Sequence, residues 1–330
     1  MSHQGQDTGA WKGHRVAVTG ATGFLGSHLT ARLVELGAAV VVLADEERPV
    51  DPTIHPWSAD VDVVVGDVRD QPAVERMLTS RRVTTVLHLA AQTKVEIANR
   101  DPLGTLDVNV RGTWNVVDAA RRSSTIEAVV VASSDKAYGD QPVLPYDEAM
   151  PLRPSNPYDV SKACADLVCL SFHHAYAVPV SITRCANVFG PGDVSWDRLI
   201  PGTIRALLHG ARPVIRSDGT MTRDFLYVDD AVAAYLCLAE AVAAGPDAAG
   251  EVFNFSNESP LTVLEVVEMV STLLRTDLAP DVRATAANEI AHQFVSSAKA
   301  RQVLHWKPQH SMESGLAETV AWYRDHLRAT

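Results

Sequence analysis

Tyr158 and Lys162, in the segment NPYDVSKACADL (156–167), have the spacing of a proton-transfer pair. Residues four apart share one face of a helix. A lysine ammonium close to a tyrosine hydroxyl favours the phenolate and so lowers the pKa of the tyrosine. A phenolate can act as a general base toward an alcohol that is being oxidised. The same spacing occurs on many solvent-facing helices, so the pair alone also allows a structural role.

A second polar group follows the apolar run 129–132. The sequence changes at once to Ser133, Ser134, Asp135 and Lys136, which supply two hydroxyls, a carboxylate and an amine. A strand that ends in this way either leads into a polar loop with a surface ion pair or presents reactive groups to a site. The neighbouring motifs decide between these two interpretations.

A glycine-rich turn, TGATGFLG (19–26), lies between a predicted strand and a predicted helix. Its glycines form the pattern G-x-x-G-x-x-G. We expect Gly20 to allow a tight turn, Gly23 to let the backbone approach a pyrophosphate, and Gly26 to let the helix pack close to the sheet. In this strand–turn–helix context the pattern predicts a dinucleotide site.

Carboxylates follow the next two predicted strands. Asp45 and Glu46 come about 20 residues after the glycines, where a carboxylate accepts hydrogen bonds from a free ribose 2′-hydroxyl and repels a 2′-phosphate. This position favours NAD over NADP, although a solvated acidic loop would have the same sequence. Asp67 ends the following strand, and we expect it to meet the adenine edge or to cap a helix.

Short apolar runs alternate with longer helical patterns along much of the chain. Continuous apolar runs are typical of strands that are covered on both faces. We therefore predict an α/β fold, a Rossmann-type doubly wound parallel sheet with a smaller, mostly α substrate-binding part. Residues 1–185 form the NAD-binding domain, to which the chain returns near 225–257, and residues 186–224 and 258–330 form the substrate-binding part. The predicted strands are 15–20, 39–45, 61–67, 84–91, 128–134, 180–187 and 251–257, and the main predicted helices are 26–37, 105–122 and 161–176.

Charge and composition exclude several function classes. The formal net charge of −11 argues against a nucleic-acid surface, because phosphate binding requires clustered Lys and Arg. No apolar run reaches membrane-spanning length, and we expect the polar residues 1–13 to be a loose leader rather than a signal peptide. The four cysteines and twelve histidines lack metal-ligand spacing, so we predict no metal and a reducing, cytoplasmic location.

The motifs described above are accompanied by HLAAQT (88–93), Asn109 and RDFLYVDD (223–230). Their order along the chain is the order found in one family of enzymes. From about Trp11 to the C-terminus the sequence resembles extended short-chain dehydrogenases/reductases that act on nucleotide sugars. The resemblance implies an NAD cofactor, a nucleotide-sugar substrate, and a homodimer built on the helices around 109–120 and 161–175. It also implies that Ser134 hydrogen-bonds the sugar 4-hydroxyl.

The resemblance implies further contacts with both ligands. Arg223 is expected to bind the substrate pyrophosphate through a bidentate contact. Arg198, Arg216 and Arg223 could each instead form a structural ion pair. The implied substrate-binding residues are Thr93, Asn187, Arg198, Arg216 and Arg223. The implied cofactor-binding residues are Gly20, Gly23, Phe24, Leu25, Gly26, Asp45, Asp67, Val68, Leu89, Ala90, Ala91, Asn109, Tyr158 and Lys162.

The residues after Ser134 separate the members of this group. Epimerases and reductases usually carry small or neutral residues there, and 4,6-dehydratases usually carry Asp-Glu. The Asp-Lys of this chain resembles CDP-glucose 4,6-dehydratases and inverting UDP-N-acetylglucosamine 4,6-dehydratases. The segments 183–201 and 288–308 resemble the CDP-glucose group, whereas RDFLYVDD is closer to the general nucleotide-sugar pattern and TKVEIANRDP (93–102) departs from it.

In a 4,6-dehydratase these residues would have separate roles. Tyr158 would take the 4-hydroxyl proton while hydride leaves C4, and the resulting 4-ketone acidifies the C5 hydrogen. Asp135, with a pKa raised by burial, would protonate the departing 6-hydroxyl. Lys136 would remove the C5 proton or stabilise the enolate. The alternatives are a 4-epimerase, which needs no C5 base, and a non-catalytic NAD-binding protein, which would tolerate replacement of Tyr158.

Overall fold

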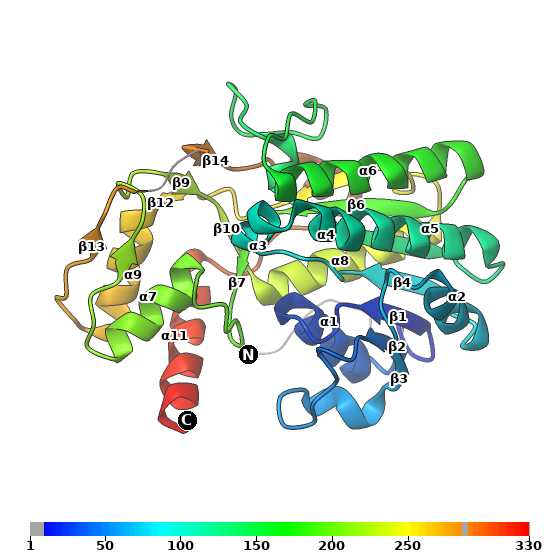
Figure 1. The fold of residues 1–330 in the computed structure, drawn as a ribbon, viewed down its shortest axis with the longest axis horizontal. Helices are drawn as coiled ribbons and strands as arrows, with labels where there is room; N and C mark the ends of the chain where they lie inside the picture. The colour runs from blue at the N-terminus through cyan, green and yellow to red at the C-terminus, as the bar shows by residue number, and fades with distance from the viewer. Residues whose placement is uncertain (1–9, 286–289, 330) are drawn as a thin grey trace. The chain divides into compact units, whose positions relative to one another are not determined.

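The computed structural model of the protein describes residues 10–285 and 290–329 (Figure 1). Of the expected leader 1–13, residues 1–9 lie outside the described residues, as do the first two residues of the segment 288–308. Trp11 is buried, and its indole N–H donates a hydrogen bond to the Glu240 carboxylate. The expectation of a loose leader is therefore wrong for Trp11.

The chain divides into two compact units. Unit 1 comprises the chain up to Ala137 together with Pro154–Thr183 and Val232–Phe253, and unit 2 comprises Tyr138–Arg153, Arg184–Ala231 and the chain from Asn254 onward. The chain thus leaves unit 1 and returns to it twice.

Seven strands form the central sheet, in the order β11-β6-β5-β4-β1-β2-β3. β1 pairs in parallel with β4 on one side and β2 on the other, so the chain order reverses at β1. Ligands of such sheets bind at the carboxyl ends of the strands, at the point of reversal. The predicted Rossmann-type fold is confirmed. The strands are β1 (Arg15–Thr19), β2 (Ala39–Ala44), β3 (Asp62–Val65), β4 (Thr85–His88), β5 (Ala128–Ala132), β6 (Val180–Cys185) and β11 (Val252–Phe255).

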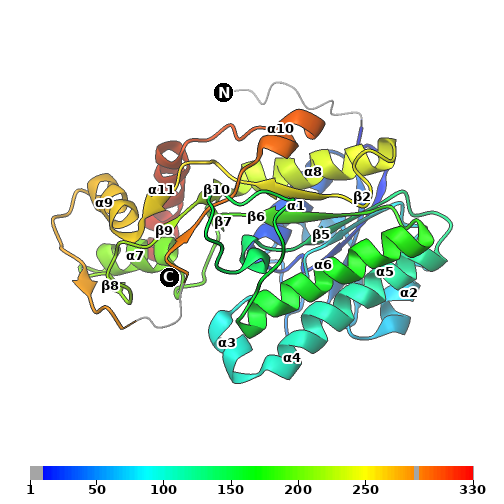
Figure 2. The same ribbon diagram turned by 90° about the horizontal axis from the view of Figure 1, so that it is seen from above.

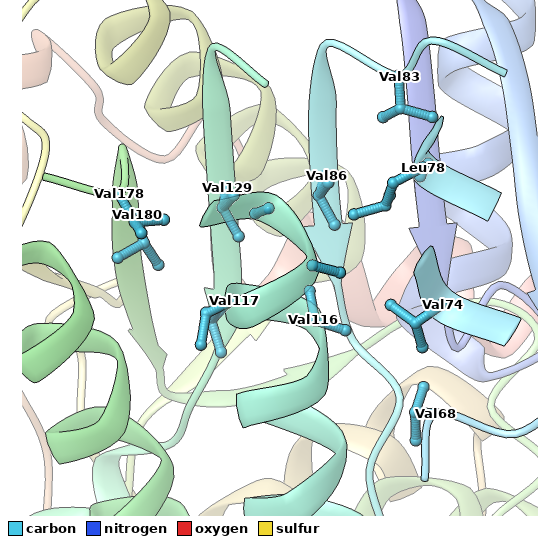
Figure 3. Close-up of a cluster of buried hydrophobic side chains, with 14 of the residues drawn as sticks. Val68, Val74, Leu78, Val83, Val86, Val116, Val117, Val129, Val178 and Val180 are labelled. Carbon is cyan, nitrogen blue, oxygen red and sulfur yellow. The ribbon is translucent and has the colours of Figure 1, made fainter. Parts of the chain in front are cut away.

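Helices cover both faces of the sheet (Figure 2). One face carries α1 (Phe24–Glu35) and α8 (Val228–Ala244), and the other carries α2 (Gln71–Ser80), α5 (Gly112–Arg122) and α6 (Pro157–Tyr176). Figure 3 shows the core under the second group, where side chains such as Val117 of α5 pack against Val129 of β5. This apolar layer holds the strand ends in fixed positions.

Two elements differ from the sequence prediction. β3 was expected to be covered on both faces, but Val65 is 61% exposed, because β3 is an edge strand that pairs only with β2. The predicted helix 105–122 is interrupted. It consists of α4 (Pro102–Leu106), a π-helical turn over Asp107–Arg111, and α5. π-helical turns within α-helices are frequent at functional sites.

Unit 2 combines short strands with helices. β7 (Asn187–Phe189) pairs with β10 (Phe225–Tyr227), β9 (Thr222–Arg223) lies between β12 (Leu261–Thr262) and β14 (His292–Gln293), and β8 (Val214–Ile215) pairs with β13 (Asp281–Val282). The Asp230 carboxylate accepts hydrogen bonds from the backbone N–H groups of Gln309 and His310 (2.8 and 3.0 Å). The helices are α7 (Leu199–Leu208), α9 (Val263–Leu274), α10 (Ala298–Leu304) and α11 (Met312–Ala329), and α3 (Val95–Arg100) belongs to unit 1.

Candidate active site

The carboxyl ends of neighbouring strands bring the candidate cofactor and catalytic segments to one edge of the sheet in unit 1. Thr19, the last residue of β1, is in register with Leu43 of β2 and His88 of β4. His88 is in turn in register with Val131 of β5. The segments that follow these residues are the glycine turn, the acidic loop at Asp45, the loop 89–93 and Ser133–Lys136.

The glycine turn leaves no room for side chains at two of its positions. Gly20 has φ +74°, and a Cβ there would lie 2.7 Å from the backbone nitrogen of Ala90. A Cβ on Gly26 would lie 2.0 Å from the Gly20 carbonyl oxygen. Gly26 therefore permits a close contact of α1 with the turn itself, whereas the sequence predicted a close contact with the sheet. A Cβ on Gly23 would meet only that same oxygen, at 3.3 Å. The turn therefore presents bare backbone ahead of α1, which suits a pyrophosphate.

The acidic residues after β2 and β3 are held by neighbouring arginines. Asp45 Oδ1 accepts a hydrogen bond from the Arg48 backbone N–H (2.6 Å). Asp67 binds the Arg69 guanidinium (2.6 Å to Nη2), and these hydrogen bonds from Arg69 hold the pKa of Asp67 below its usual value. α2 has Asp70 at its N-cap, so the alternative of Asp67 as a helix cap is wrong.

Asn109 connects the loop after β4 with the start of α6. Its Nδ2 donates to the Gln92 carbonyl (3.0 Å) and to Ser161 Oγ (2.8 Å), while its Oδ1 accepts from the Gln92 backbone N–H (2.7 Å). Ser161 donates in turn to the Tyr158 carbonyl (2.6 Å). Asn109 is buried in the π-helical turn. It therefore positions the backbone on both sides of the candidate site.

His88 has a structural role that the sequence did not reveal. Thr113 donates to the Asn109 carbonyl (2.6 Å), so its oxygen accepts from His88 Nε2 (3.1 Å). Thr19 Oγ1 accepts the Ala90 N–H (3.2 Å) and donates to His88 Nδ1 (2.7 Å). Burial lowers the pKa of His88 to about 3, so the ring is neutral. The only available signal was a histidine at the end of an apolar strand, in HLAAQT.

Tyr158 and Lys162 lie in the first turns of α6 and are only 8% and 5% exposed. The alternative of a solvent-facing pair is therefore wrong. Lys162 Nζ donates a hydrogen bond to the Ala132 carbonyl at the end of β5 (2.8 Å). Burial lowers the pKa of Lys162 to about 8, and the nearby Asp166 carboxylate partly opposes this shift. A lysine tuned in this way can exchange protons near neutral pH.

Ser134, Asp135 and Lys136 form a compact turn after β5. Asp135 and Lys136 begin a 3₁₀ turn that extends to Tyr138. Ser134 Oγ donates to Asp135 Oδ1 (3.1 Å) and accepts the Lys136 backbone N–H (3.2 Å). Asp135 is only 4% exposed, so the alternative of a surface ion pair at the strand end is wrong for this carboxylate.

Most of the predicted substrate-binding residues belong to unit 2. The Asn187 amide donates to the Asp224 carbonyl (3.2 Å), and Arg223 Nη1 donates to the Thr222 carbonyl (2.8 Å). Arg198 pairs with Asp193 (3.0 Å), which is the structural ion pair left open for it. Arg216 and, in unit 1, Thr93 are exposed. Their contacts with substrate remain predictions.

Within residues 10–285 and 290–329, no cluster of three or more His, Cys, Asp or Glu side chains could hold a metal ion. None of the helices described there is long and apolar enough to cross a membrane.

Comparison with known proteins places this geometry in a family. The model of the NAD dependent epimerase/dehydratase family matches residues 16–255. The chain belongs to this family. The CDP-glucose 4,6-dehydratase of Salmonella typhimurium is 30% identical, over 98% of this chain and 94% of that protein. The UDP-glucose 4-epimerase of Mycolicibacterium smegmatis is also 30% identical, over 94% of this chain and 99% of that protein.

Solved structures agree with this family assignment. The dTDP-glucose 4,6-dehydratase of Streptomyces venezuelae, crystallised with NAD, is 30% identical and has a TM-score of 0.87, covering 96% of this chain and 98% of that one. The predicted NAD cofactor and the resemblance to nucleotide-sugar enzymes are confirmed at the level of the family. The glycine turn and the acidic loop at Asp45 fit a dinucleotide without a 2′-phosphate.

Proposed function

We propose that this protein is an NAD-dependent nucleotide-sugar 4,6-dehydratase that produces an NDP-4-keto-6-deoxy sugar, with CDP-glucose as the first-choice substrate. One observation carries the proposal. Asp135 is buried immediately after Ser134 and immediately before Lys136, at the end of the strand to which Lys162 is hydrogen-bonded. A 4-epimerase needs Tyr158 and Lys162 but has no use for a buried carboxylate and an amine in this place.

The first half of the proposed reaction uses α6. Bound NAD⁺ supplies the hydride acceptor for C4 and later the hydride donor for C6. Tyr158 takes the proton of the 4-hydroxyl, and Ser134 holds that hydroxyl by a hydrogen bond. Lys162 favours the phenolate of Tyr158 by its charge. Because the resulting ketone is conjugated with the C5 carbanion, the C5 hydrogen becomes acidic.

The second half uses the turn after β5. Lys136 takes the C5 proton as a neutral amine, and the ammonium that results stabilises the enolate oxygen. Asp135 in its acid form gives its proton to the 6-hydroxyl, which leaves as water while the C5–C6 double bond forms. Hydride addition at C6 and proton return to C5 complete the 4-keto-6-deoxy sugar. The burial of Asp135 suits an acid that must hold its proton near neutral pH.

The second candidate is a nucleotide-sugar 4-epimerase. It is favoured by the relative from Mycolicibacterium smegmatis, which is as similar to this chain as the dehydratase from Salmonella typhimurium. The two candidates differ at Asp135. An Asp135→Asn variant should lose nearly all turnover in a dehydratase, whereas an epimerase should retain most of its rate.

Mass spectrometry tests the proposal directly. The protein is incubated separately with CDP-glucose, UDP-glucose, dTDP-glucose, GDP-mannose and UDP-N-acetylglucosamine, with NAD⁺ added. Loss of one water from one of them, without net consumption of NAD⁺, is the expected result. Unchanged masses for all five would refute the dehydratase on these substrates. Proton NMR of the same mixtures would then detect an epimer.

Dimerisation is a separate part of the proposal. Trp114 on α5 and Leu167 on α6 are large apolar side chains that are 44% and 60% exposed, and the two helices pack against each other. We propose that a second copy of the chain covers them. Analytical ultracentrifugation should give the dimer mass for the native chain and the monomer mass for Trp114→Glu. A monomeric native chain would contradict this part alone.

A further inference from the structure

His88, at the end of β4, is a buried titratable group that the proposed mechanism does not use. Its ring is bonded on both sides, because Nδ1 accepts from Thr19 Oγ1 (2.7 Å) and Nε2 donates to Thr113 Oγ1 (3.1 Å). Burial lowers the pKa of His88 to about 3, so the ring does not act as an acid or a base near neutral pH. A buried imidazole that is bonded at both nitrogens can still hold two elements at a fixed separation.

On one side the imidazole supports the loop that follows β4. Thr19 is the last residue of β1, directly before the glycine turn, and its Oγ1 accepts the Ala90 backbone N–H (3.2 Å). A Cβ on Gly20 would lie 2.7 Å from the same Ala90 nitrogen, so the glycine turn and this loop are in close contact. Both belong to the proposed cofactor site. The bond between Thr19 and His88 therefore fixes the hydroxyl that holds the cofactor loop.

On the other side the imidazole is linked to the residue that is the proposed base. Thr113 Oγ1 donates to the Asn109 carbonyl in the π-helical turn (2.6 Å). Asn109 Nδ2 donates to Ser161 Oγ (2.8 Å), and Ser161 donates to the Tyr158 carbonyl (2.6 Å). These four residues are buried, and all of them lie in unit 1. A continuous series of buried hydrogen bonds thus joins the end of β4 to the Tyr158 backbone.

We propose that His88 is a positioning residue that sets the place of Tyr158 relative to the cofactor loop, through Thr113 on one side and Thr19 on the other. The proposal rests on the proposed function for the role of Tyr158 as the base that takes the 4-hydroxyl proton, a role that the dehydratase and the 4-epimerase share. His88 acts through its neighbours and needs no contact with the sugar. Hydride transfer requires close alignment of base, sugar and cofactor, so a small displacement at either end is costly.

A purely structural role is the competing explanation. A buried imidazole with two hydrogen bonds stabilises the fold, and its loss lowers the melting temperature. That role predicts that NAD affinity and the rate of C4 oxidation fall together with stability, whichever of the two bonds is lost. A positioning role predicts instead that each bond of His88 affects a different readout.

Two substitutions at His88 separate its two bonds. Asparagine carries its amide at the δ position, so His88→Asn keeps an acceptor for Thr19 and loses the donor to Thr113. Glutamine carries its amide at the ε position, so His88→Gln keeps the donor to Thr113 and loses the acceptor for Thr19. Thr113→Val and Thr19→Val remove the same two bonds from the opposite partners.

The variants should differ in the readout that they change. We expect His88→Asn and Thr113→Val to slow C4 oxidation about tenfold, measured as NADH formation in a single turnover, while the Kd for NAD stays within about threefold. His88→Gln and Thr19→Val should raise that Kd about tenfold in calorimetry and leave C4 oxidation at saturating NAD within about threefold. Equal losses of both readouts in the two His88 variants would overturn the proposal.

Thr183→Val is the matched control for stability. Thr183 Oγ1 donates to Tyr235 Oη (2.8 Å) and is buried in the same sheet and unit, but it takes no part in this series of hydrogen bonds. We expect this variant to have a lower melting temperature and native values of both readouts. A fall of either readout by the factor seen in the His88 variants would show that stability alone governs it and would refute the positioning role.

Hydrogen exchange followed by mass spectrometry tests the link to Tyr158 without any sugar substrate. In the complex with NAD, the peptide over the first turns of α6 should exchange faster in His88→Asn and Thr113→Val and at the native rate in His88→Gln. Residues 232–244 of α8, on the opposite face of the sheet (Figure 2), provide the internal reference. Native exchange of α6 in all three variants would contradict the link. If no sugar is oxidised, the proposed function fails, while hydrogen exchange and NAD affinity still decide the role of His88.

Discussion

Lys162 offers a quantitative test of the active-site environment. Its side chain is almost completely buried, and its Nζ has a hydrogen bond to the Ala132 carbonyl. Burial lowers the pKa of Lys162 from 10.5 to about 8, although Asp166 favours the charged form. Replacing Lys162 with methionine keeps the length of the side chain and removes the titrating group.

The sign of the effect follows from proton binding. The unfolded chain binds a proton at this lysine up to a pH near 10.5, whereas the folded chain binds it only below a pH of about 8. Between these values the unfolded state binds more protons, so the free energy of unfolding rises with pH. The full difference amounts to about 3 kcal/mol. Between pH 7 and pH 9.5 it predicts a rise of about 2 kcal/mol from this one residue.

Urea denaturation of the native chain and of Lys162→Met at those two pH values measures this rise. The difference in free energy of unfolding between the two proteins should change by about 2 kcal/mol in favour of the native chain as the pH rises. The contributions of the other titrating groups cancel in this difference, because both proteins contain them. The exposed Lys307→Met is the matched control. A difference that does not vary with pH would refute the proposed desolvation of Lys162.

Three further predictions concern single positions. Gly26→Ala places a Cβ 2.0 Å from the Gly20 carbonyl, so NAD retention through gel filtration should be lost; retention equal to the native chain would contradict the turn geometry. Tyr158→Phe should keep the circular dichroism spectrum and lose at least about 100-fold in C4 oxidation, measured as NADH formation. Asp45→Ser removes a carboxylate that repels a 2′-phosphate, so the ratio of NAD to NADP affinity, measured by calorimetry, should fall about tenfold.

The fold could be predicted from the sequence because its signals are local. The valine-rich runs are strands in the structure, and the glycine turn lies between the first strand and the first helix, as expected. The exposure of β3 could not be predicted, because its valines read as a buried run and only its position at the edge of the sheet exposes them. The burial of Tyr158 and Lys162 likewise depends on the packing of α6 against the sheet.

The interior of the site could be predicted only in part. The residue types at 134–136, 158 and 162 are visible in the motifs, but the contacts that orient them are not. The π-helical turn at Asn109 forms among bonds to Gln92 and Ser161, which are distant in the sequence. Asp159 looks like an ordinary polar residue of a helix start, and only the structure shows that it is buried.

The hydrogen bonds of His88 in unit 1, which the sequence did not reveal, are as consequential as the motif residues. The donors run in one direction, from the Ala90 N–H through Thr19 to His88, and from His88 through Thr113 to the Asn109 backbone. Thr113 must accept from His88 Nε2, because its own proton goes to the Asn109 carbonyl, so a neutral His88 carries its proton on Nε2 and accepts from Thr19 at Nδ1. A protonated His88 would donate to Thr19 as well, and burial disfavours that form by lowering the pKa of the ring to about 3. One imidazole, whose tautomer is fixed by its neighbours, thus joins the end of β1 beside the glycine turn to the π-helical turn. Asn109 in that turn is bonded to Ser161 at the start of α6.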